Sequence, residues 1–189
     1  MNKAEYRKLV NMITSKSSEE MLEAASSLNQ NLSDFLRGDV FRKILFFSPL
    51  KDEPQIQPTI QEHLASGRVC LPRMTDNKIV PVEVDSFDDL EMVENCGPKW
   101  GPILTPKRSC KPTDLSLIDV AIVPGRAFDK AGVRLGRGKG YYDKFLSSLS
   151  AAKVGIGFHF QLFGKLPQEP HDILMDVVIT EKVVQRILL

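Results

Sequence analysis

The sequence predicts an α/β fold in which a mostly parallel sheet carries helices on both faces. Short runs that are apolar at nearly every position alternate along the chain with segments whose apolar residues recur every three or four positions. The first pattern is typical of strands buried on both faces, and the second of helices that cover them. We expect one domain spanning residues 1–189, because 189 residues with 42% hydrophobic content suffice for one core and would be cramped as two.

Helical spacing predicts helices at residues 4–13, 17–32, 58–66 and 141–149. Ser17 and Glu20 form the S-x-x-E pattern of a capping box, which marks the start of the second helix. Pro58 suits a first helical position, and Gly67 suits the end of the same helix.

Apolar runs rich in β-branched and aromatic residues predict strands at residues 43–48, 68–72, 79–84, 117–125, 153–158 and 176–180. Segments marked by Pro and Gly interrupt this pattern at residues 49–58 and 97–112. We expect both segments to be loops, and Trp100 stands alone among turn-forming residues in the second.

Composition argues against several classes of partner. Lys and Arg total 25 and Asp and Glu total 24, so a net charge of +1 gives no field that would hold nucleic acid or an anionic membrane. No run of eighteen apolar residues or secretion signal is present, and we expect a cytoplasmic protein with small-molecule partners. Cys70, Cys96 and Cys110 are odd in number and widely spaced, which predicts free thiols.

The most informative segment is VPGRAFDKAGVRLGRGKGYYDKFL, residues 123–146. Glycines that alternate with basic residues before a helix let the backbone approach phosphate oxygens, and the helix start adds unpaired amides. The pattern is not a Walker A loop, because Lys139 is followed by Gly140 in place of Ser or Thr. It also lacks the spacing of a dinucleotide fingerprint. The residues alone leave open a phosphate loop or a mobile basic turn.

The run from Pro124 to Asp143 closely resembles the signature of the 5-formyltetrahydrofolate cyclo-ligase family, also called methenyltetrahydrofolate synthetases. A basic N-terminal helix, the pair Asp52–Glu53 and the closing EPHDILMDVVITE follow the order found in that family. The resemblance implies a ligase of one-carbon metabolism. It implies that ATP, with Mg²⁺, phosphorylates the formyl oxygen of 5-formyltetrahydrofolate, that N10 attacks the activated carbon, and that loss of phosphate leaves the 5,10-methenyl bridge.

The resemblance also assigns the ATP site. Lys139 would act on the transferring phosphoryl group, and Arg137 would share the catalytic role. Lys3 and Arg7 would reach the nucleotide from one face of the first helix, since they are four residues apart. Solvated loop and helix charges are the alternative for all of these cations. The full set comprises Lys3, Arg7, Arg134, Gly136, Arg137, Gly138, Lys139, Gly140 and Tyr141.

Two carboxylates, Asp143 and Asp172, match the Mg²⁺ ligands of the family, and hard oxygens suit that ion. A helix-terminus acid and a turn residue are the respective alternatives. Glu53 matches a folate contact, where it would accept hydrogen bonds from the pterin. Gln55 departs from the pattern, because the family often has a second acid there. The flat apolar slot for the folate rings is expected from Phe47, Trp100, Tyr141 and Tyr142, with Tyr141 and Trp100 preferred and core packing the alternative for Phe47 and Tyr142.

Two other functions remain open from the sequence. A non-catalytic folate or nucleotide sensor would keep the loop and lose the activating groups, which the presence of Lys139 and Asp143 argues against. A sugar-phosphate or coenzyme A enzyme could use a similar α/β fold, because fold alone does not decide function.

Overall fold

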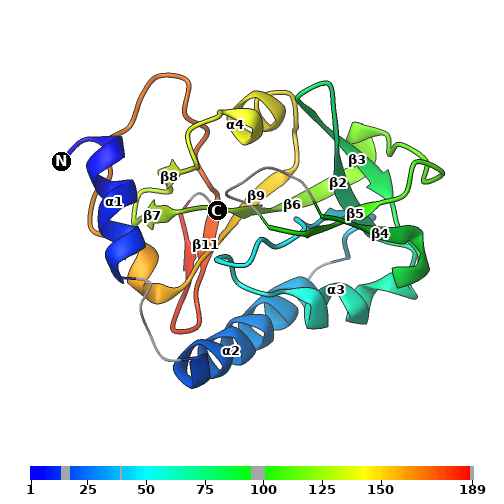
Figure 1. Ribbon diagram of the computed structural model, residues 1–189, viewed down its shortest axis with the longest axis horizontal. Helices are drawn as coiled ribbons and strands as arrows, with labels where there is room; N and C mark the ends of the chain where they lie inside the picture. Colours follow the sequence, from blue (N-terminus) through cyan, green and yellow to red (C-terminus); the bar gives the residue numbers. More distant parts are fainter. Residues whose placement is uncertain (14–17, 39, 95–100, 188–189) are drawn as a thin grey trace.

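The computed structural model describes residues 1–13, 18–38, 40–94 and 101–187. Its centre is a seven-stranded sheet with the order β12-β11-β9-β6-β1-β2-β3 (Figure 1). The five inner strands pair in parallel, and the two edge strands, β3 and β12, are antiparallel to their neighbours. The predicted α/β class is therefore confirmed. The strands are β1 (Lys43–Leu45), β2 (Val69–Thr75), β3 (Lys78–Glu83), β6 (Ile118–Pro124), β9 (Ala152–Ile156), β11 (Val177–Ile179) and β12 (Val184–Arg186).

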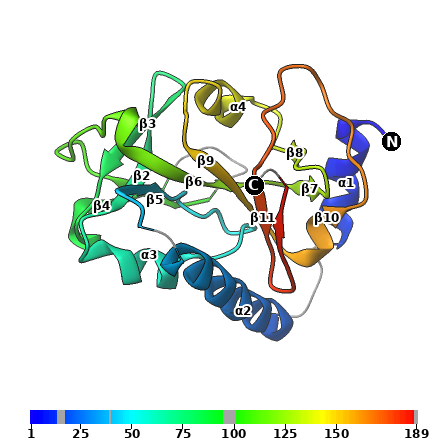
Figure 2. The ribbon, with the colours of Figure 1, turned by 180° about the vertical axis from the view of Figure 1, so that it is seen from behind.

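Helices cover both faces of this sheet, as Figures 1 and 2 show from opposite sides. The helices are α1 (Lys3–Ile13), α2 (Ser18–Arg37), α3 (Gln57–Leu64) and α4 (Tyr141–Leu146). Strand β6 shows the alternation: Val120 and Ile122 pack in the cluster that includes residues of α2 and α3, whereas Ala121 and Val123 pack with α4. No helix in the described ranges is long and apolar enough to cross a membrane.

Several short elements were not expected from the sequence. The segment 97–112, predicted as a loop, contains β5 (Ile103–Pro106), which pairs antiparallel with β4 (Leu90–Val93). Three of the four β4 residues are exposed, so the strand lacks the apolar run that identifies buried strands. The remaining elements are β7 (Ala127–Asp129), β8 (Arg134–Leu135), β10 (Leu162–Phe163) and the 3₁₀ helices η1 (Phe87–Asp89), η2 (Leu115–Leu117) and η3 (His159–Gln161).

Some predicted boundaries shift. Strand β1 ends at Leu45, although the apolar run continues to Ser48, and α4 ends at Leu146 in place of residue 149. Pro58 lies in the first turn of α3, as expected. The predicted capping residue Ser17 lies outside the described residues.

Phe128 of β7 packs the start of the glycine-rich segment against the sheet. Its side chain is 1% exposed. A Cβ atom at Gly155 would lie 2.5 Å from the ring, one at Gly125 2.6 Å, and one at Gly157 3.0 Å. Non-bonded carbon atoms do not approach as closely as 2.5 or 2.6 Å, so side chains at Gly155 and Gly125 would collide with the ring, and one at Gly157 would require the ring to shift. This packing sets the position from which the chain enters the glycine-rich segment.

Candidate active site

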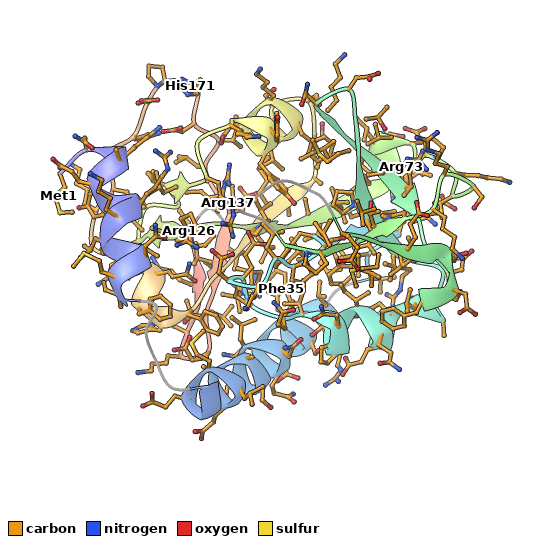
Figure 3. All side chains as sticks on the ribbon, viewed as in Figure 1. Met1, Phe35, Arg73, Arg126, Arg137 and His171 are labelled. Atoms are coloured by element: carbon orange, nitrogen blue, oxygen red, sulfur yellow. The ribbon has the colours of Figure 1, made fainter. Side chains whose placement is uncertain are left out.

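A cleft of about 1080 Å³ lies where the parallel strands β1 and β6 end. The carboxyl edge of the sheet is the usual place for ligands in open α/β folds. The hairpins β2–β3 and β4–β5 form one wall, and the glycine-rich segment with α4 forms the other. In Figure 3, Arg73 marks the hairpin side and Arg137 lies near the middle of the molecule. The predicted site residues that line the cleft are Glu53, Arg134, Gly136, Arg137, Lys139, Gly140, Tyr141, Tyr142 and Asp143.

Glycine conformations shape the segment before α4. Gly138 has a φ of 99° and Gly140 a φ of 67°, both in the left-handed region that favours glycine. Lys139, between them, is exposed, and its Nζ lies 5.7 Å from the centre of the Tyr141 ring. Gly140 directly precedes the first residue of α4. The turn therefore presents the exposed ammonium group of Lys139 at the cleft, next to the start of α4.

Arg134 is a buried cation beneath this segment, with 4% of its surface exposed. One of its terminal nitrogens donates to Asp143 Oδ1 at 2.9 Å, and the other donates to the backbone oxygen of Pro124 at 3.2 Å. Its Nε is buried with no partner among the described residues. Asp143 lies in the first turn of α4 and lines the cleft. The predicted phosphate contact and the predicted metal ligand thus form an ion pair.

Glu53 and Arg137 form a second ion pair in the cleft. Arg137 donates from Nε and Nη2 to Glu53 Oε1, at 3.1 and 2.9 Å. The other oxygen of Glu53 accepts the backbone N–H of Leu50 at 3.0 Å. Burial raises the pKa of the Glu53 carboxyl, and the charge of Arg137 opposes that shift. The predicted folate ligand is therefore joined directly to a predicted phosphate ligand.

The departure at Gln55 has a structural role. Its Nε2 donates to the backbone oxygens of Leu50 and Glu53, at 2.9 and 2.8 Å. A carboxylate could not donate these bonds. Gln55 thus braces the loop that holds Glu53 and does not line the cleft.

Sequence reasoning missed Arg126. It is 6% exposed, and it donates to Asp52 Oδ2 at 2.6 Å and to the side-chain oxygen of Asn11 on α1. Asp52 also accepts from Arg137 through both oxygens. The available signal was a charged residue directly after a buried strand, in the run VPGRAFD.

Helix α1 lies at the edge of the glycine-rich segment (Figure 1). Lys3 Nζ is 2.8 Å from both oxygens of Asp172 and 3.0 Å from Glu169. Arg7 donates to the backbone oxygen of Gly136 at 2.9 Å, so Lys3 and Arg7 do share a face turned toward the loops. Burial alone would raise the pKa of Asp172, but the ammonium of Lys3 and the Glu169 N–H hold it below its ordinary value. None of Lys3, Arg7 and Asp172 lines the cleft.

The aromatic residues expected around the folate divide into three groups. Phe47 does not line the cleft: it is 1% exposed and packs within the core. Its strand ends at Leu45, and the chain beyond turns Phe47 inward. Tyr141 and Tyr142 line the cleft, and Tyr141 donates to Asn77 Oδ1 of the β2–β3 turn at 3.0 Å. Burial raises the pKa of Tyr142. Trp100 lies outside the described residues.

Comparisons with known proteins agree on one family. The sequence profile described as the 5-formyltetrahydrofolate cyclo-ligase family matches residues 2–181. A 5-formyltetrahydrofolate cyclo-ligase of Mus musculus is 27% identical over 176 residues, which cover 87% of this chain and 86% of the mouse protein.

Solved structures give the same result. The 5,10-methenyltetrahydrofolate synthetase of Aquifex aeolicus superposes with a TM-score of 0.85 at 34% identity, over 99% of this chain and 93% of that one. A 5,10-methenyltetrahydrofolate synthetase from Mycoplasma pneumoniae shares the fold with a TM-score of 0.75 at 24% identity, over 96% and 99% of the two chains.

Proposed function

The chain belongs to the 5-formyltetrahydrofolate cyclo-ligase family and is a ligase that forms a carbon–nitrogen bond in folate metabolism; from this premise we propose that ATP and Mg²⁺ drive its ring closure. The observation that carries the proposal is Arg137, which lies in the glycine-rich segment and bonds Glu53. A side chain of the expected phosphate-binding loop that bonds Glu53, the residue expected to bind the folate, suits a reaction between a folate and a nucleotide. We propose that residues 1–189 form one catalytic domain.

The chemistry proceeds in two steps. The formyl oxygen attacks the γ-phosphorus of ATP, so an O–P bond forms, the bond to ADP breaks, and ADP leaves. N10 then attacks the activated formyl carbon and loses its proton, and departure of inorganic phosphate leaves the methenyl bridge. Such transfers depend on position and on neutralised charge, with little covalent help from side chains.

The cations of the cleft have separate roles in this proposal. Lys139, exposed beside α4, follows the migrating phosphoryl group as a point charge. Arg137 holds that group from the folate side, and buried Arg134 fixes Asp143 beneath the loop. The N–H groups of the segment 136–140 and the ring of Tyr141 complete the ATP site. Lys3 and Arg7 extend that site from α1.

Glu53 is proposed to orient the pterin. A carboxylate can accept paired hydrogen bonds from the amino and ring N–H groups. Tyr141 and Tyr142 line the cleft and offer flat apolar surface to the rings. Phe47 would support this surface from within the core.

The donor set of the cleft fits Mg²⁺. Asp143 offers hard oxygen ligands beside the proposed phosphate loop. When bound, the ion would neutralise charge on the transferring phosphates. Asp172 is the proposed second ligand; its oxygens are bonded to Lys3, and Glu169 and His171 lie with it in a group whose ligand atoms are within 4.8 Å of one another. Cys70 and Cys110 are free thiols, which suits a reducing, cytoplasmic setting.

The test is to mix the purified chain with 5-formyltetrahydrofolate and Mg·ATP and to follow the absorbance of the methenyl product. We expect product only when folate, ATP and Mg²⁺ are all present, and chelation of Mg²⁺ should stop the reaction. Binding of both ligands without turnover would favour the sensor. Absence of folate binding would overturn the proposal altogether.

A further inference from the structure

Arg126 connects three segments that are distant in the sequence. Its backbone N–H donates to the backbone oxygen of Leu135 at 2.7 Å, which ties it to the glycine-rich segment. Its guanidinium donates to Asp52, in the loop after β1, and to Asn11 of α1. Arg126 is 6% exposed and is not among the residues that line the cleft. Its contacts therefore act on other residues.

Asp52 is shared between two guanidinium groups. Its Oδ2 accepts from Arg126 at 2.6 Å and from Arg137 at 3.2 Å, and its Oδ1 accepts a further bond from Arg137. Burial alone would raise the pKa of Asp52, but the two arginines hold it below its ordinary value. Because Arg126 holds the charged carboxylate of Asp52 in place, Asp52 in turn restricts the orientation of the Arg137 side chain. Figure 3 shows Arg126 beside Arg137, on the side toward α1.

The two side-chain partners of the Arg126 guanidinium belong to segments that are proposed for different ligands. Asn11 belongs to the helix that carries Lys3 and Arg7, which are proposed for the nucleotide. Asp52 precedes Glu53, which is proposed for the folate. A bound nucleotide would fix α1 through Lys3 and Arg7. Helix α1 would then fix Arg126 through Asn11, and Arg126 would fix Asp52. The folate would then bind to a loop whose ordering cost has already been met.

We propose that Arg126 is a positioning residue that couples nucleotide binding to folate binding through Asn11 and Asp52. The inference rests on the proposed function, and it adds that the two ligands increase each other's affinity. Linkage requires the effect to be reciprocal, and couplings in proteins are commonly about five- to 150-fold.

The experiment measures the dissociation constant of 5-formyltetrahydrofolate with and without a saturating, non-hydrolysable ATP analogue and Mg²⁺, and the reciprocal pair. We expect the unmodified protein to show coupling of about fivefold or more. Arg126→Met keeps an apolar stem in the buried site and removes the charge. It should bring the coupling near one while each ligand alone binds within about threefold of normal, a change of under 1 kcal/mol. Arg126→Lys should restore part of the coupling, because an ammonium can reach one partner at a time.

Two further variants separate coupling from stability. Asn11→Ala cuts the same link at an exposed residue of α1, so it keeps the test valid if Arg126→Met fails to fold. Arg42→Met is the matched control, because it removes a guanidinium from the Arg42–Asp119 ion pair, outside the cleft. Its coupling should be unchanged.

The outcomes distinguish this inference from the proposed function. Undiminished coupling in folded Asn11→Ala and Arg126→Met, or no coupling in the unmodified protein, would overturn the inference while methenyl formation stands. Failure of the unmodified protein to form the methenyl product with Mg·ATP would instead overturn the proposed function.

Discussion

The two carboxylates that the resemblance assigns to Mg²⁺ lie in different regions. Asp143 belongs to the body of the molecule, where it lines the cleft and pairs with Arg134, a buried residue of β8 that also bonds the backbone of Pro124. Asp172 lies outside the cleft lining, and its partner is Lys3 on the terminal helix. Each carboxylate pairs with one cation. The partner of Asp143, Arg134, is buried in the body of the molecule, whereas the partner of Asp172, Lys3, belongs to α1.

The attachment of α1 explains this difference. Val10 is buried in a core cluster and Tyr6 packs edge-on against Phe163, whereas Lys3, Arg7 and Asn11 reach the rest of the molecule through hydrogen bonds or ion pairs. The site therefore combines groups held by the body of the molecule, which should carry catalysis, with groups presented by α1, which should tune nucleotide affinity.

Lys139→Ala should give the largest effect, because its ammonium lies at the cleft and should matter most in the transition state. We expect kcat to fall by roughly 100- to 1000-fold, with the dissociation constant of an ATP analogue changed only a few-fold. Steady-state kinetics and analogue binding measure the two quantities. Lys144→Ala, which removes an exposed charge from the same helix, is the control. A near-normal kcat with weakened binding would remove Lys139 from catalysis.

Asp143→Asn should rank second. The amide keeps the shape of the side chain and loses the charge that a hard cation needs, so the Mg²⁺ concentration for half-maximal activity should rise about tenfold or more. Loss of the charge also leaves Arg134 buried without its partner, which should lower stability by roughly 3 kcal/mol. The measurements are a Mg²⁺ titration of activity and denaturant unfolding. If stability falls while the Mg²⁺ dependence stays the same, Asp143 is a structural residue.

The double variant Lys3→Ala with Arg7→Ala should have the smallest effect and should show it in one parameter. We expect the KM for ATP to rise about tenfold, roughly 1.4 kcal/mol, while folate binding and the melting temperature stay near normal. Tyr6 and Val10 keep their packing in this variant. Lys8→Ala, an exposed charge on the same helix, serves as the control. Unchanged ATP dependence would mean that α1 carries solvated charges and that the body binds the nucleotide without it.

Features with a local cause were predicted from the sequence. The inner strands were found because both of their faces are buried, and α2 was found because its apolar residues keep helical spacing. Phe47 lies in the core, which was the alternative to its site role, and the sequence could not decide between the two because a run such as KILFFS looks the same whether its end faces a core or a cleft. Strand β4 was missed because exposed strands lack an apolar run.

The residue links within the site could not be predicted in the same way. Arg126 bonds partners that are 74 and 115 positions away, and Lys3 bonds one that is 169 positions away. Local patterns carry no information about such pairs. The glycine-rich segment was identified because its chemistry is concentrated in one stretch, 123–146. The separate contacts that hold this segment in place depend on the folded chain.

Phe128 and its three surrounding glycines have a consequence for how this chain can change over generations. An alanine at Gly125 or Gly155 would collide with the ring, so neither glycine can be replaced first. Replacing Phe128 first would leave a cavity in the core, at a cost of about 3 to 5 kcal/mol for a change to alanine. Replacement of Gly125, Gly155 or Phe128 by alanine, each as a single step, is therefore expected to weaken the protein. Related sequences should change these positions jointly or retain them together, and Gly125, which directly precedes Arg126, is kept by an aromatic ring that never meets a substrate.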